Sequence, residues 1–147
     1  MKKFEFRLGS VLRLRDTQLM IEKNKLQQLF AERTKLENSL RSIADERKES
    51  TTWIQGVASP TSGDLRALSA FLLGSKARET TLRQAIESCE AEISEQRQRT
   101  LLAERNQKLL INLKSKQRLE WQHEFDKELE TVAQEAWQSA ARSKISS

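Results

Sequence analysis

The chain has 147 residues and a formal net charge of +5; 32% of its residues are charged and only 37% are apolar, with four Gly, one Pro and no Tyr. An ordinary compact core needs more aliphatic and aromatic side chains than this, whereas the mixed sign of the charge argues against general disorder. The abundance of Leu, Glu, Gln, Arg, Lys and Ala, with few helix breakers, predicts long helices.

Targeting and redox signals are sparse. No stretch approaches the roughly 18 apolar residues of a membrane span, and arginines interrupt the region after Lys2 and Lys3 where a signal peptide needs an apolar core. Cys89 is the only cysteine, which excludes an internal disulfide framework. We therefore expect a cytoplasmic protein that does not insert directly into a membrane.

The chain begins with an apolar tip. Residues 4–19 read FEFRLGSVLRLRDTQL, in which Phe4, Phe6 and Leu8 alternate with other residues. This alternation is too short to make a strand that has nothing to pair with. From about Ser10 the apolar spacing becomes helical, so we predict that the tip is a docking surface at the start of a helix.

A first helix is predicted over residues 10–55 by two rows of positions that recur every seven residues, the spacing of a two-stranded coiled-coil seam. One row consists of Leu12, Leu19, Leu26, Arg33, Leu40, Arg47 and Ile54, and the other of Leu8, Arg15, Glu22, Leu29, Leu36, Ile43 and Ser50.

The helical pattern breaks once, over residues 56–64. This stretch reads GVASPTSGD and holds the only Pro and two of the four Gly, which is loop chemistry. Asp64 or Ser62 is expected to cap a second helix over residues 65–142, followed by a disordered tail over 143–147.

The second helix carries an apolar stripe that is interrupted and then resumes. The stripe runs through Leu65, Leu68, Leu72, Leu82, Ile86, Cys89 and Ile93, becomes polar at Gln107, Lys114 and Gln117, and re-forms at Trp121, Phe125, Leu129, Val132 and Ala136. Steps of four along the last part resemble a stutter, which locally unwinds a left-handed supercoil.

Two amphipathic helices joined by one short loop predict an all-α fold, a single elongated antiparallel two-helix hairpin over residues 1–147. Counting outward from the loop places Leu12 opposite roughly residue 108. About thirty residues of the second helix then overhang without an intramolecular partner. An amphipathic helix of that length is marginal alone in water, so it implies a binding partner.

Charge is sorted along the second helix. Residues 97–118 hold seven basic residues and one acid, whereas residues 120–135 hold six acids and one Lys. The basic block lies opposite the equally basic start of the first helix, where like charges weaken the pairing. The open end is therefore predicted to be a contact surface for something acidic.

No catalytic, cofactor or metal site is predicted. His123 is the only histidine and has no partner for acid–base work nearby in sequence, and Cys89 fits the seam as a small buried hydrophobe. The chain lacks a Gly-rich phosphate loop and a His/Cys cluster. We expect a protein that is not an enzyme. Phe71, just after the loop, either flanks the seam or is an exposed anchor for a partner.

The order of these features resembles the FliJ family of flagellar type III export proteins over essentially the whole chain. The resemblance is carried by the N-terminal F-x-F-x-L-x-x-V-L-x-L-R run, the Gly/Ser/Pro break, the L-x-x-L-x-x-F start of the second helix and its long Glu/Arg/Gln continuation. It implies an antiparallel coiled coil, similar to the central shaft of a rotary ATPase, that is peripheral to the inner face of the cell membrane.

The resemblance also implies partners. The end that carries both termini is expected in the hole of the hexameric export ATPase ring, through Phe4, Phe6, Arg7, Leu8, Arg13, Arg15, Trp121 and Phe125. The middle region is expected to reach the membrane protein of the export gate through Phe71, Ser75, Arg78 and Leu82, of which Ser75 and Arg78 are less apolar than such a patch requires. Export chaperones are expected as further partners, and nucleic acid is not.

Two hypotheses from other functional classes remain open on the basis of the residues alone. A nucleic-acid-binding helical arm would use the basic block, and its affinity would fall steeply with salt. A self-associating scaffold would use the unpaired C-terminal stripe and would sediment as dimers or bundles.

Overall fold

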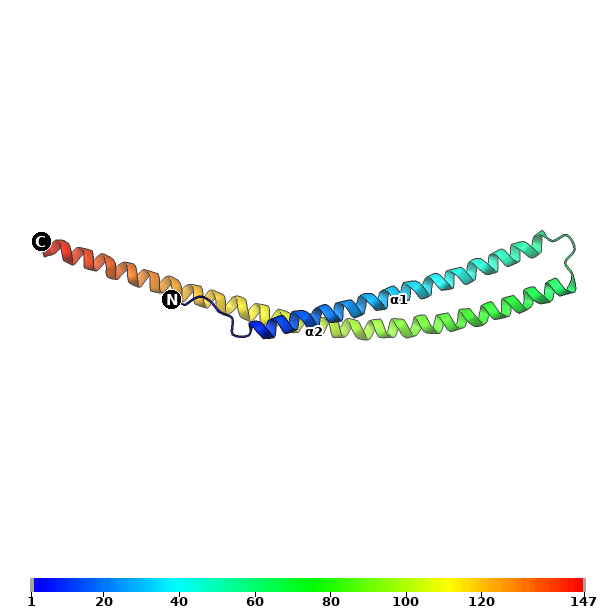
Figure 1. Ribbon diagram of the computed structural model, residues 1–147, viewed down its shortest axis with the longest axis horizontal. Helices are drawn as coiled ribbons and strands as arrows, with labels where there is room; N and C mark the ends of the chain where they lie inside the picture. The colour runs from blue at the N-terminus through cyan, green and yellow to red at the C-terminus, as the bar shows by residue number, and fades with distance from the viewer. Residues whose placement is uncertain (1, 147) are drawn as a thin grey trace. The chain divides into compact units, whose positions relative to one another are not determined.

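The computed structural model describes residues 2–146, which form two long helices and no strand. Helix α1 spans Gly9–Gly56 and helix α2 spans Ser62–Ile145. A short loop joins them, and the two helices pack against each other (Figure 1). The predicted all-α two-helix hairpin is confirmed.

The loop is shorter than the sequence predicts because α2 is capped earlier. The backbone N–H of Asp64 donates to Thr61 Oγ1 at 3.1 Å, and the backbone N–H of Thr61 donates to Asp64 Oδ2 at 3.1 Å. This reciprocal pair is a capping box, which satisfies two N–H groups that the helix start leaves unpaired. Thr61 is therefore the N-cap instead of Asp64 or Ser62, and Asp64 supports it from the first turn.

Packing divides the chain into two units. The hairpin unit comprises Ile21–Leu101 and contains the loop. The terminal unit comprises Met1–Met20 and Leu102–Ser147, and thus holds the N-terminal segment, the first turns of α1 and the C-terminal part of α2. Both helices pass through both units.

The hairpin unit has a thin core. Its buried apolar side chains are Ile43, Cys89 and Ile93, and Ser75 of α2 is completely buried. All the predicted seam positions of α1 in this unit are buried or half-buried, including the polar Glu22, Arg33 and Arg47. A fully buried aliphatic side chain contributes about 1.5–3 kcal/mol, so these few residues matter for the pairing of the helices.

Polar contacts across the seam fix the register of the hairpin unit. Gln96 Nε2 donates to the backbone carbonyl of Glu22 at 3.2 Å and also to the Glu22 carboxylate. Thr100 Oγ1 contacts the same carbonyl at 3.5 Å, and the Cys89 thiol donates to the carbonyl of Leu29 at 3.4 Å. Because a shifted register would remove the acceptors of the buried Gln96 amide, its contacts favour one alignment.

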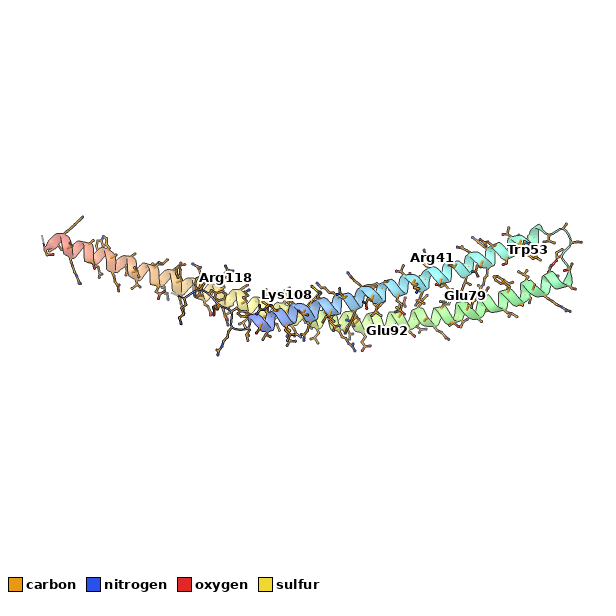
Figure 2. All side chains as sticks on the ribbon, in the orientation of Figure 1. Arg41, Trp53, Glu79, Glu92, Lys108 and Arg118 are labelled. Atoms are coloured by element: carbon orange, nitrogen blue, oxygen red, sulfur yellow. The ribbon has the colours of Figure 1, made fainter. Side chains whose placement is uncertain are left out.

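Nearer the loop, charged pairs join the two helices. Arg47 lies 2.6 Å from Glu79, which Figure 2 labels on α2, and Arg78 lies 3.5 Å from Glu46. Leu65 does not join them, because it is 52% exposed in the first turn of α2. Its predicted place in the seam is wrong, since the longer α2 starts at Ser62 and its first turn extends past the buried positions of α1.

In the terminal unit, the first turns of α1 pack against α2 through a buried apolar residue and a polar contact. Leu19 is buried, and Gln107 Nε2 donates to Asp16 Oδ1 at 2.7 Å. Leu12 lies one turn before Asp16, which places it within about one turn of the predicted residue 108. Lys114 is exposed although the projected seam includes it, because a long cationic side chain keeps its ammonium group in water.

The packing of the core can be tested at Ile93, which is only 3% exposed. We expect Ile93→Ala to lower the free energy of unfolding by about 2–4 kcal/mol, since the cavity cannot collapse fully. The control Ile21→Ala, at a position that is 47% exposed on α1, should change it by less than about 0.5 kcal/mol. Urea unfolding followed by circular dichroism measures both values, and equal losses would contradict the burial described.

Candidate partner-binding surfaces

The N-terminal segment lies against α2 in the terminal unit. The Phe4 and Trp121 rings are 6.0 Å apart at an angle of 52°, and Trp121 stacks on Phe125 at 5.3 Å and 14°. Trp121 Nε1 donates to the backbone carbonyl of Lys2 at 3.0 Å. The structure thus brings together three of the predicted ATPase contacts in one aromatic cluster, and residues 2–6 act as a strap over α2.

The strap and α2 enclose a shallow depression of about 460 Å³. Its lining combines aromatic, basic and acidic side chains: Lys2, Lys3, Phe4 and Glu5 from the strap, and Gln117, Glu120, Trp121 and Glu124 from α2. Two lysines and two α2 glutamates therefore face the same space.

The strap ends where α1 begins. The backbone N–H of Gly9 donates to the carbonyl of Phe6 at 3.0 Å, and the backbone N–H of Leu12 donates to the carbonyl of Leu8 at 2.9 Å. Phe6 is half-buried and Leu8 is 36% exposed. Leu8 therefore extends the α1 seam only weakly.

The terminal unit carries a basic section, defined as residues 2–20 with 102–118. It holds ten basic residues and three acids; the basic residues are Lys2, Lys3, Arg7, Arg13, Arg15, Arg105, Lys108, Lys114, Lys116 and Arg118. Figure 2 labels Lys108 and Arg118 on α2. Arg7 and Arg13 are exposed, and half-buried Arg15 donates to Gln18 at 3.0 Å. Surplus positive charge of this density attracts acidic surfaces.

The residues predicted for the export gate lie in the hairpin unit and differ in accessibility. Phe71 and Leu82 are half-buried and Arg78 is exposed. Ser75 is completely buried, so it offers no surface to a partner while the helices are paired. Its Oγ lies 3.5 Å from the Arg78 guanidinium. Burial of Ser75 was not foreseeable from its type, since serine is usually exposed.

A groove of about 550 Å³ lies beside these residues. It is lined by Ser39, Ser42, Ile43 and Glu46 of α1 and by Ala77, Arg78, Thr81 and Leu82 of α2. Small side chains on both helices leave this space open, and two of the predicted gate residues line it. At its edge the guanidiniums of Arg83 and Arg47 hydrogen-bond to Glu79 and hold the pKa of that carboxyl below its usual range.

The titratable residues that could perform chemistry are isolated. His123 is exposed on α2, and burial raises the pKa of the Cys89 thiol, which keeps it in the less reactive protonated form. Over residues 2–146, no group of three or more His, Cys, Asp or Glu is placed to hold a metal ion. No helix in the same range is long and apolar enough to cross a bilayer.

Phe30 and the two arginines beside it form a feature that the sequence pattern did not predict. The guanidinium carbons of Arg33 and Arg97 lie 5.4 Å and 5.3 Å from the centre of the Phe30 ring. Cation–π contacts of this kind contribute about 0.5–1 kcal/mol at exposed sites. They explain how Arg33 occupies a seam position without leaving its charge in an apolar layer.

Comparison with protein-family models, with curated proteins and with solved structures finds no match to this chain.

The strap can be tested through tryptophan fluorescence. In a background that carries Trp53→Phe and Trp137→Phe, Trp121 is the only tryptophan. Phe4→Ala should red-shift its emission and increase quenching by acrylamide. Loss of an aromatic pair of about 1 kcal/mol shifts the docked strap about five-fold toward release. Leu14→Ala, at an exposed α1 position, serves as the control; identical quenching in both variants would show that Phe4 does not cover Trp121.

Proposed function

We propose that this chain is a non-enzymatic, FliJ-like component of a flagellar type III export apparatus. In this role it is the central stalk of the hexameric export ATPase and promotes assembly and turnover of the ring. The observation that carries the proposal is the composition of the terminal unit, in which the aromatic strap, the basic section and the unpaired part of α2 occur together on a two-helix hairpin. The N-terminal sequence run that resembles the FliJ family gives the proposal its identity.

The physical role follows from the mismatch in symmetry between a two-helix stalk and a ring of six subunits. Two helices cannot present six equal contacts to a ring of six subunits, so the stalk favours one or a few subunits at a time. A ligand that binds two conformations with different affinity shifts the equilibrium between them. The stalk thereby biases ring assembly and orders the ATP cycle, with the basic section contacting acidic groups on the ring.

We assign the proposed contact with the export gate to the hairpin unit. Arg78 and Leu82 line the groove, and Phe71, Arg78 and Leu82 are each accessible in whole or in part. We assign them to the cytoplasmic domain of the export-gate membrane protein, and export chaperones are further partners. The chain is then cytoplasmic and peripheral at the inner face of the cell membrane.

A second candidate function is favoured by the basic block of α2. Positive charge without aromatic interleaving over residues 97–118 can neutralise nucleic-acid phosphates, and such binding depends steeply on salt. The six acids of residues 120–135 follow directly on the same helix and repel a nucleic acid that continues along it. The export role is therefore preferred.

Addition of the chain to the purified hexameric export ATPase should raise both the hexamer fraction and ATP turnover. Arg7→Glu, Arg13→Glu and Arg15→Glu combined should raise the concentration for half-maximal stimulation about ten-fold or more, because each reversed contact is worth up to about 1 kcal/mol. The matched control reverses three exposed lysines of α1 in the hairpin unit, Lys23, Lys35 and Lys48.

Light scattering and a phosphate-release assay measure the two responses. Turnover that is indifferent to the chain over a wide concentration range would contradict the stalk function. An equal loss in both triple variants would show that net charge, and not the basic section, governs the effect.

A further inference from the structure

The C-terminal part of α2 repeats one arrangement of residues. An apolar row runs through Trp121, Phe125, Leu129, Val132 and Ala136, in steps of four and three that keep it on one helix face. An acid directly precedes four of these five residues: Glu120, Glu124, Glu128 and Glu135, with Thr131 before Val132. An acidic row therefore runs beside the apolar row along the whole segment.

The strap covers only the beginning of this double row. Trp121 and Phe125 are half-buried in the aromatic cluster, and Glu120 and Glu124 flank them. Beyond Phe125 the apolar row is exposed: Leu129 is 53% exposed, Val132 is 59% exposed, and every residue from 126 to 140 is classed as exposed. The uncovered face thus continues an interface that the chain already uses.

The strap also shows which chemistry fits the double row. Lys2 and Lys3 line the same depression as Glu120 and Glu124, while Phe4 contacts Trp121. Basic side chains thus share a depression with glutamates of the acidic row, and an apolar ring lies on the apolar row. A partner for the uncovered continuation should combine the same two features.

We infer that the face of α2 beyond Phe125, centred on Leu129, Val132 and Glu135, docks a basic amphipathic helix of a partner protein. The spacing of three and four along the apolar row matches a facing helix packed as in a coiled coil. Lysine or arginine residues beside the apolar row of the partner then face the acidic row.

Charge excludes the other common occupants. Six acids against one lysine over residues 120–135 repel nucleic acid and anionic membrane surfaces. A second copy that docked through the same face would place acidic row against acidic row, which is also repulsive. This surface goes beyond the proposed function, because Leu129, Val132 and Glu135 are not among its ATPase contacts, and it stands if that proposal fails.

The test uses the full-length chain and two labelled synthetic peptides of 18 residues. Both peptides carry leucines at spacings of three and four; one has lysines at the remaining positions and the other has glutamates. Fluorescence anisotropy should show that the lysine peptide binds at least about ten-fold more tightly than the glutamate peptide and that its affinity falls with salt.

Substitutions locate the binding face. Leu129→Ser with Val132→Ser should weaken binding of the lysine peptide about ten-fold, and Glu135→Lys should weaken the lysine peptide while strengthening the glutamate peptide. Leu119→Ser is the matched control, because Leu119 is 72% exposed but lies roughly 200° around the helix from Trp121. Circular dichroism verifies that each variant retains its helix content.

Three results would overturn the inference. The first is equal affinity for the two peptides. The second is binding that ignores the Leu129 and Val132 substitutions but increases in Phe4→Ala, which would place the peptide under the strap. The third is self-association of the chain, seen in sedimentation and abolished by Leu129→Ser with Val132→Ser, which would make a second copy the occupant.

Discussion

The unequal length of the two helices is the constraint on which the rest of this structure depends. Helix α2 has 84 residues and α1 has 48, so α1 cannot cover the whole apolar stripe of its partner. The chain covers a further part with residues 2–6, which place Phe4 on Trp121. What remains beyond Phe125 is exposed. The exposed apolar face is therefore a consequence of chain geometry.

The interface between the two helices is small and largely polar. Few apolar side chains are buried, and Gln96, Thr100 and Ser75 are buried among them. A buried group that bonds across the seam contributes little net stability but is costly to leave unpaired, so it favours one register. The contacts of Gln96 with Glu22 and of Arg47 with Glu79 serve this purpose in the hairpin unit.

Sequence patterns predicted the fold well because heptad spacing is a local signal. The α1 rows from Leu12 to Ile54 all lie on the packed face. The strap was not predicted, since an extended segment that folds back on a helix leaves no periodic trace. The burial of Ser75 and the exposure of Leu65 were also not predicted, because they depend on how closely the two helices approach each other at each point. The aromatic residues of the candidate site were identified, but their mutual contact was not.

Amide hydrogen exchange along α2 in the isolated monomer tests the central claim most directly, because protection reports which parts of a helix are held by packing. We expect the slowest exchange over residues 89–100, intermediate exchange around Trp121 and Phe125, and the fastest over residues 126–140. Protection of residues 126–140 equal to that of residues 89–100, in a chain that sediments as a monomer, would contradict it.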